Sequence, residues 1–230
     1  MKKIFLLTLA AAISFISFSQ VKWGAQVIGG LNSGTITGFE DDEDEFIKNK
    51  SIFGLGAGVI AEVPLATEVT FRPSLNFLQK GMAFDWNYSD PIFGSEEIKF
   101  KTDLFYAELP LNFAYNGNLK FGKYFIGMGP SFGFGLSGKA KTTYTFQDPG
   151  MPVETETEST DAFGSEDDDG LGLKRFEISA SFIGGVQWNN GFFVNAGYLL
   201  GLNNLAPGGE DGSYKHTGLQ LTVGMFFGKK

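Results

Sequence analysis

A long stretch of strictly alternating residues, Lys174–Asn203, constrains the fold of this chain most. In its first half, the apolar set is Phe176, Ile178, Ala180, Phe182, Val186 and Trp188, and the polar set is Arg175, Glu177, Ser179, Ser181 and Gln187. Asn189–Gly191 is typical of a tight turn, and the alternation then restarts and continues to Leu202. A period of two over this length predicts a β-hairpin whose strands are longer than the usual five or six residues or so, with one continuous apolar face.

Composition excludes several classes of function. The chain has 230 residues, a formal net charge of -8, no cysteine and one histidine. Without cysteine there is no disulfide and no thiolate metal site, and a single imidazole leaves little for catalysis. A nucleic-acid partner is not expected, because phosphate binding needs clustered lysine and arginine. The 32 glycines and 25 phenylalanines favour strands and turns.

The first residues have the pattern of a secretory signal peptide. Lys2 and Lys3 give the positive start, an apolar run covers Ile4–Phe18, and Ser17–Ser19 resembles a cleavage site. We therefore expect residues 1–19 to be a cleaved signal peptide and residues 20–230 to form one domain. An uncleaved anchor is the alternative, although the run is short for a spanning helix of about 20 residues. An exported chain without a later apolar helix can span a membrane only as strands.

Eight segments of the mature chain alternate as strands do. They are Val21–Asn32, Ser51–Val63, Thr67–Leu78, Thr102–Tyr115, Lys120–Ser137, Lys174–Trp188, Phe192–Asn203 and Tyr214–Phe227. The alternation also allows the third segment to continue through Met82–Tyr88 and the fifth to continue to Phe146. The links after the second, fourth and sixth segments are short, with Asn116–Asn118 as a tight turn, whereas the others are longer and polar. Alternating link lengths are typical of transmembrane barrels. The predicted fold is all-β: an eight-stranded antiparallel up-and-down transmembrane β-barrel with short periplasmic turns and long acidic outer loops.

In such a barrel the apolar faces meet outer-membrane lipid, and the polar faces fill the lumen. Four aromatic residues are then expected at the periplasmic rim as a girdle: Trp23, Tyr115, Trp188 and Phe227. Six side chains are predicted to form a polar network in the lumen: Arg72, Glu108, Arg175, Glu177, Gln187 and Gln220. Because buried charges need partners, we expect Arg72 to pair with Glu108.

An interior that is just wide enough for its own side chains predicts a plugged scaffold. A path for protons or solute along the same charges is the alternative, and solute flux into liposomes would support it. Pro73, Pro110 and Pro130 each remove a ladder donor in a sheet without a free edge, so local β-bulges are expected there.

Two motifs have the residue types of a chemical site. His216 lies near Ser213 and Asp211, and a hydrolase needs such a set within reach, but common residues in a glycine-rich loop favour a polar strand end. The Ser165–Gly170 stretch has the carboxylate density of a calcium loop, with Asp167 and Asp169 at ligand positions. It misses the EF-hand spacing by one residue, which leaves weak divalent-ion binding or a solvated loop as interpretations.

Five sequence blocks resemble the PorT-like outer-membrane β-barrel family found in Bacteroidota. They are Phe71–Phe77 followed by Gln79–Gly81, Tyr106–Leu111, Gly127–Ser131, Tyr198–Asn204, and the closing strand. The resemblance covers most of the mature chain and implies the barrel, with the three prolines inside its blocks. It supplies no catalytic motif, and the family name derives from a member linked to protein secretion. The acidic loops and the Gly228–Lys230 extension depart from the family pattern.

The sequence therefore predicts an integral outer-membrane protein that is not an enzyme and needs no cofactor. Its expected role is structural, adhesive or accessory to secretion, with outer-membrane lipid, the barrel assembly machinery and a surface or secretion-system protein as partners. A soluble exported β-barrel that binds a small apolar ligand is one alternative, and it requires apolar residues inside. A barrel-embedded lipid hydrolase or acyltransferase that uses His216 is another.

Overall fold

A computed structural model describes residues 21–37, 47–90, 94–147, 151–165, 170–207 and 213–227. The predicted signal peptide, the acidic stretch Glu40–Glu45 and the Gly228–Lys230 extension lie outside these ranges. The strands within them are β1 (Lys22–Thr37), β2 (Ile47–Lys50), β3 (Ile52–Pro64), β4 (Val69–Lys80), β5 (Ala83–Asp90), β6 (Gly94–Leu119), β7 (Gly122–Gln147), β8 (Glu154–Asp161), β9 (Phe176–Trp188), β10 (Phe192–Gly201) and β11 (Ser213–Phe227). The described ranges hold no helix that is long and apolar enough to cross a membrane.

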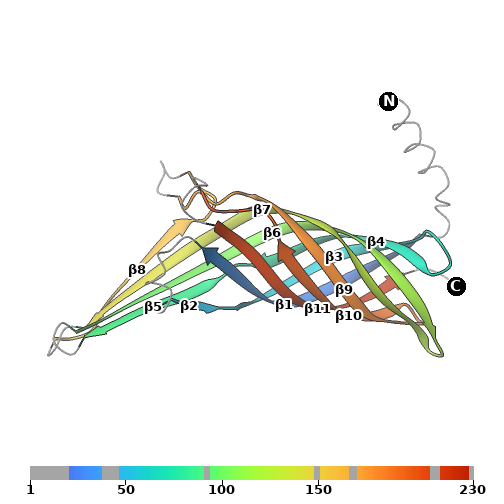
Figure 1. Ribbon diagram of the computed structural model, residues 1–230, viewed down its shortest axis with the longest axis horizontal. Helices are drawn as coiled ribbons and strands as arrows, with labels where there is room; N and C mark the ends of the chain where they lie inside the picture. Colours follow the sequence, from blue (N-terminus) through green and yellow to red (C-terminus); the bar gives the residue numbers. More distant parts are fainter. Residues whose placement is uncertain are drawn as a thin grey trace, which may run out of the picture.

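Eight strands pair in a closed antiparallel ring, as predicted (Figure 1). The order around the ring is β1, β3, β4, β6, β7, β9, β10 and β11. The first and last strands close it with a continuous ladder that runs from Trp23 opposite Phe227 to Thr37 opposite Ser213. Each of the eight predicted segments lies in or overlaps one of these strands, so the eight-stranded barrel is confirmed.

Short turns gather at one end of the ring, which is called the turn end below. They lie at residues 65–68, 120–121 and 189–191, where Gly191 has a φ of 92°. The prediction of a turn at Asn116–Asn118 was wrong, because β6 continues through it to Leu119. The ring of Tyr124 packs over Gly117, where a Cβ would lie 2.2 Å from it.

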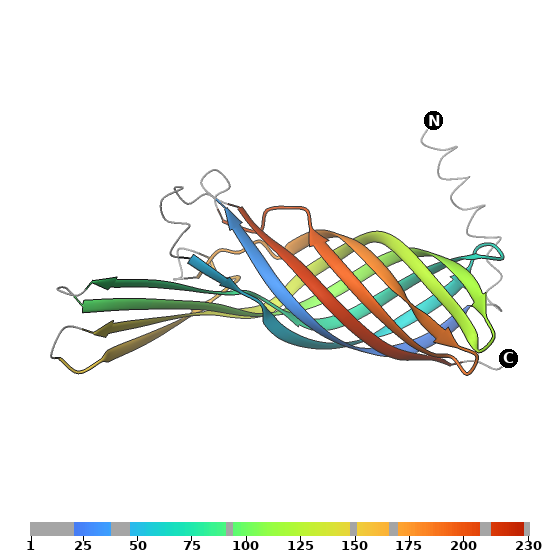
Figure 2. The same cartoon turned by 60° about the horizontal axis from the view of Figure 1, so that its bottom comes forward.

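At the other end of the ring, two strands continue far past it (Figure 2). The allowed continuation of the fifth segment to Phe146 agrees with β7, whereas β6 begins before the predicted start at Thr102. β6 and β7 each have 26 residues. The connection expected before Thr102 is the first part of β6, and the irregular stretch expected after Gln147 contains β8. With β2 and β5 these parts form a sheet outside the ring, in the order β2, β5, β6, β7 and β8, called the extension below.

The expected bulges at the prolines were also wrong. The pairing of β4 with β6 has the same register on both sides of Pro73 and Pro110, and β7 keeps its register with β9 through Pro130. Some backbone pairs next to the prolines are missing from the ladders, but the register on either side of the gap is the same. The register shift found in the described ladders lies between Phe105 and Tyr106, where the ring passes into the extension.

Candidate functional site

The side chains of the ring sort into an apolar outside and a polar inside. On β11, Leu219 and Leu221 are 61% and 57% exposed, whereas Thr222 is 5% exposed. Large apolar side chains on the outer surface with buried polar groups suit a barrel that is surrounded by lipid. This is the reverse of what a soluble barrel with an apolar ligand needs, so the structure does not favour that alternative.

Buried charges occupy the half of the lumen next to the extension. The Lys80 Nζ lies 2.7 Å from Glu108 Oε2 and 3.2 Å from Glu177 Oε1. His216 Nδ1 lies 2.9 Å from Glu177 Oε2, and all four side chains are at most 4% exposed. The two carboxylates also accept hydrogen bonds from Ser131 and Ser179. Each buried charge thus has an opposite charge and further polar partners, which a low-dielectric interior requires.

His216 belongs to this network. Its Nε2 lies 2.5 Å from the Tyr214 hydroxyl, and its Nδ1 faces Glu177. The nearby Ser179 Oγ donates to Glu177, and not to the imidazole. Asp211 lies outside the described residues, and Ser213 starts β11. The hydroxyl–imidazole contact that activates a serine nucleophile does not occur among the described partners of His216.

Between this charged network and the extension, apolar side chains close the lumen. The buried cluster consists of Met82, Leu104, Tyr106, Ala162, Phe163, Leu173, Leu205 and Tyr214. Ala162, Phe163, Leu173 and Leu205 come from the segments between ring strands, and the rest come from the strands and the start of the extension. The Tyr106 ring contacts both Phe163 and His216, so the cluster rests directly on the charged network.

Arg72 occupies the half of the lumen next to the turn end. Its guanidinium lies 3.8 Å from the ring centroid of Phe125, and Nη2 donates to Gln187 Oε1 at 3.4 Å. The expected pair with Glu108 was wrong. The register sets Asn112 opposite Arg72 on β6, with Glu108 four residues away, or about 13 Å along the strand. Glu62 of β3 lies nearest to Arg72, 3.8 Å from its Nε.

The remaining residues of the predicted network lie in different surroundings. Glu177 and Gln187 are buried, and Gln220 is half-buried beside a cavity of about 40 Å³ that separates the two charged halves. Arg175 is exposed, which corrects its placement in the lumen. It precedes the first residue of β9, and its Nη1 donates to the carbonyl of Gly135 at 2.9 Å.

The network contains two charged residues that sequence reasoning missed, Glu62 and Lys80. Glu62 lies on the same face of β3 as Gly54, Gly56 and Gly58, so the period of two places it inside the barrel. Lys80 is two residues beyond the predicted end of its strand at Leu78, and the alternation continues to it without a break. Extending the period of two through Lys80 would have found the central cation of the lumen.

The four predicted girdle residues lie at the turn end. Trp23 pairs with Phe227, Tyr115 pairs with Val69 at the start of β4, and Trp188 pairs with Gly122. Trp23, Tyr115 and Phe227 are 50% to 62% exposed, and Trp188 is half-buried. Their contact with a membrane interface remains a prediction.

The metal hypothesis rested on Asp167 and Asp169, which lie outside the described residues. Among the residues that are described, no group of three His, Cys, Asp or Glu side chains is arranged to hold a metal ion.

Comparisons with solved structures find barrels of low similarity. The attachment invasion locus protein Ail of Yersinia pestis is 15% identical, covering 90% of this chain and 98% of that chain, with a TM-score of 0.37. CarO2 of Acinetobacter baumannii is 10% identical over 87% and 98%, with a TM-score of 0.37. Neisserial surface protein A is 10% identical over 89% and 97%, with a TM-score of 0.34. TM-scores this low support no conclusion about function, and the sequence has no match among curated proteins.

The family of this chain is shown by a match to a family model. The model described as an outer membrane protein beta-barrel domain matches residues 18–206, which is most of the chain and includes seven of the eight ring strands. With the closed ring and its apolar outer surface, this match shows that the chain belongs to the outer membrane protein beta-barrel domain family.

Proposed function

We propose that this outer-membrane protein is a non-enzymatic surface recognition protein of the PorT-like type found in Bacteroidota. The closed barrel is the anchor in lipid, the turn end faces the periplasm, and the extension projects from the cell. An adhesive or secretion-accessory role then depends on what the extension binds. The extension itself is the observation that supports this proposal, because a purely structural anchor has no need of it.

The extension has two chemically different faces. The register puts seven apolar side chains on one face, which is called the aromatic face below: Phe84, Trp86, Tyr88, Ile98, Phe100, Tyr144 and Phe146. Phe84 stacks on Phe100 with ring centroids 4.9 Å apart, and both pack against the apolar cluster of the lumen. Farther out, Tyr88 and Phe146 are 46% and 43% exposed. Exposed aromatic rings on a projecting sheet are typical of a binding surface.

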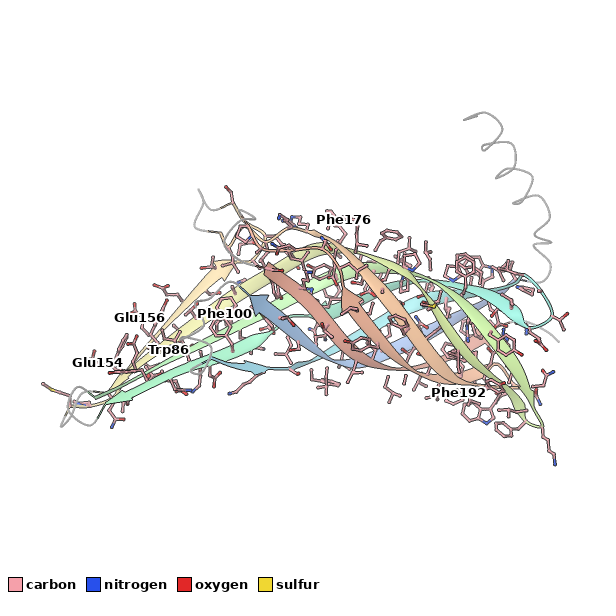
Figure 3. All side chains as sticks on the ribbon, viewed as in Figure 1. Trp86, Phe100, Glu154, Glu156, Phe176 and Phe192 are labelled. Atoms are coloured by element: carbon pink, nitrogen blue, oxygen red, sulfur yellow. The ribbon has the colours of Figure 1, made fainter. Side chains whose placement is uncertain are left out.

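The charges of the aromatic face are all negative among its described residues. β8 supplies Glu154, Glu156 and Glu158, with Glu154 opposite Phe146 and Glu156 opposite Tyr144. Figure 3 shows Glu154 and Glu156 on the same projecting part as Trp86 and Phe100. No ion pair is found for these three carboxylates within the described ranges. Their charge is therefore available to a partner.

Several charges of the opposite face pair with one another. Lys99 pairs with Glu97 and Lys101 pairs with Asp103, each at 2.7 Å. Lys50 also pairs with Asp85. Lys139 and Lys141 of the same face have no ion pair among the described residues, so charge pairing on this face is partial. The two faces differ in the sign of their unpaired charge, which is negative on the aromatic face and positive on the opposite face.

A basic polypeptide fits the aromatic face best. Lysine and arginine complement the three glutamates and also interact favourably with aromatic rings. β8 is the last strand of the sheet, so its outer edge can add one more extended strand. A partner strand with basic residues at alternate positions would satisfy both requirements.

Binding of a basic probe tests this proposal. The probe is a decapeptide of alternating Lys and Thr, titrated against the folded full chain in lipid nanodiscs. The triple variant Glu154→Gln, Glu156→Gln, Glu158→Gln should bind about tenfold or more weakly, because charge-assisted contacts are lost. The matched control changes Thr155, Thr157 and Ser159 of the opposite face to Ala and should bind normally.

Two results would contradict the proposal. One is equal binding of the probe by the glutamine and control variants. The other is solute flux through the protein in a liposome swelling assay. A filled lumen predicts no flux. If the barrel were a channel, the extension would have to be explained as part of that channel and not as a binding surface.

A further inference from the structure

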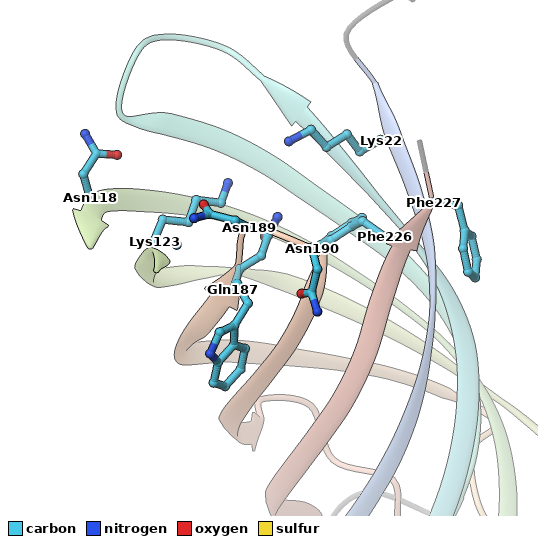
Figure 4. A pocket seen from close by; sticks show the side chains of 11 residues that line it. Lys22, Asn118, Lys123, Gln187, Asn189, Asn190, Phe226 and Phe227 are labelled. Atoms are coloured by element: carbon cyan, nitrogen blue, oxygen red, sulfur yellow. The ribbon is translucent and has the colours of Figure 1, made fainter. Parts of the chain in front are cut away.

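A pocket opens at the turn end of the barrel, far from the extension. Its volume is about 420 Å³, which is within the usual size of small-ligand sites. The polar side chains that line it are Lys22, Asn118, Lys123, Gln187, Asn189 and Asn190. Figure 4 shows Phe226 on the pocket side of β11 and Phe227 on the opposite side. No aspartate or glutamate lines this pocket among the described residues.

Positive charge exceeds negative charge around the pocket. Three cations share the carboxylate of Glu62: Lys123 at 2.8 Å, Lys22 at 3.8 Å and Arg72 at 3.8 Å. Glu68 lies beyond them, in a smaller adjoining pocket that also contains Glu62. One shared carboxylate does not neutralise three cations, so the larger pocket is electropositive.

The buried charge of Arg72 lies beside the pocket, although Arg72 itself lines the internal cavity of the barrel. It is 1% exposed, yet its Nε and Nη1 donate no hydrogen bond to any described group. Its Nη2 contacts Gln187, which lines the pocket, and its guanidinium is 5.3 Å from the ring of Phe226, which also lines it. Because this buried charge adjoins two residues of the lining, it adds to the positive potential at the pocket.

We propose that this pocket binds the carboxylates of a short acidic peptide. Lys22 and Lys123 would contact the carboxylates, and the amides of Asn118, Asn189 and Asn190 would pair with the peptide backbone. Primary amides both donate and accept hydrogen bonds, as a peptide backbone does. This site is separate from the extension. In the proposed orientation it faces the periplasm, but the binding itself does not depend on that orientation.

Calorimetry on the folded full chain in detergent micelles tests the site. The probes are N-acetyl-triglutamate, its neutral analogue N-acetyl-triglutamine, and inorganic phosphate. Triglutamate should bind with release of heat, and the other two should bind at least about tenfold more weakly. Lys22→Gln should weaken triglutamate binding about tenfold, and Lys123→Gln should weaken it further, because Lys123 is the less exposed of the two.

Lys120→Gln is the matched control, since it removes one charge from the exposed turn beside the pocket without changing its lining. Lys22 is largely exposed, so Lys22→Gln keeps the fold and remains informative if Lys123→Gln does not fold. Three results would overturn the assignment: equal binding of triglutamate and triglutamine, binding of phosphate as tight as triglutamate, or equal effects of Lys22→Gln and Lys120→Gln. Absence of triglutamate binding would overturn it as well.

Discussion

Lys80 illustrates how single side chains hold the lumen together. It lies between Glu108 and Glu177, and it is 3% exposed. Attraction to two carboxylates offsets the cost of burying an ammonium group, and the same ammonium makes both carboxylates tolerable. The stability of the barrel interior therefore depends strongly on one cation.

Lys80→Met should reduce the free energy of unfolding by about 3–5 kcal/mol, because it leaves two carboxylates without their shared counter-charge. Urea unfolding in detergent, followed by heat-modifiable gel migration, measures the change. The control Lys101→Met removes a cation from an exposed pair and should have little effect. A Lys80→Met protein as stable as the Lys101→Met protein would show that the network contributes no net stability.

Close contacts leave no space for a side chain at some glycines of the ring. A Cβ at Gly58 would lie 2.2 Å from Asn76 Oδ1 and 2.5 Å from the Leu75 carbonyl oxygen, and a backbone oxygen cannot move aside easily. Gly58→Ala should therefore cost about 1–3 kcal/mol in the same unfolding assay. At Gly184 the nearest atom to a Cβ is 3.9 Å away, so Gly184→Ala should be tolerated. Equal effects of the two substitutions would contradict this account.

Sequence predicted the burial of Arg72, Glu108, Glu177 and Gln187 from the period of two alone. It did not predict their partners, because pairing across a lumen depends on strand stagger, which one sequence does not contain. Arg72 faces Glu62 and not Glu108 for this reason. Arg175 was placed wrongly because the alternation was counted past the true start of its strand.

At the scale of elements, the eight ring strands were predictable because each has an apolar face. The extension was not, and β8 shows why. Its sequence from Glu154 to Asp161 has no apolar residue, and nearly all of it is exposed. Threonine-rich alternation supports a strand only when a neighbour is present to pair with it, and β7 is that neighbour.

Because β8 has no apolar residue to contribute to the core, we predict that it is dispensable for folding. Removing Thr142–Glu158 and joining the ends with Asn-Gly deletes most of β8 and the end of β7, and keeps Ala162 and Phe163 in the apolar cluster. The shortened protein should still insert and show heat-modifiable migration, with an unchanged urea midpoint. If it does not fold, the extension is part of the folding core.

The molecule as a whole consists of a filled cylinder and a projecting sheet. Apolar side chains close the lumen toward the extension, and the charged network of Lys80 lies directly beneath them. Arg72 with its aromatic neighbours occupies the half next to the turn end. In the function proposed above, the ring anchors the protein in lipid and its two ends bind partners. This description of the molecule depends on which side of each ring strand contacts lipid.

Lipid contact can be measured directly because the chain has no cysteine, so each introduced cysteine is unique. Spin labels at Leu219, Gln220, Leu221 and Thr222 of β11, in the full chain in liposomes, report oxygen accessibility from the lipid phase. We expect high oxygen accessibility at Leu219 and Leu221 and low accessibility at Gln220 and Thr222. Uniform values along the four positions, or high values at Gln220 and Thr222, would contradict a lipid-embedded barrel with a polar interior.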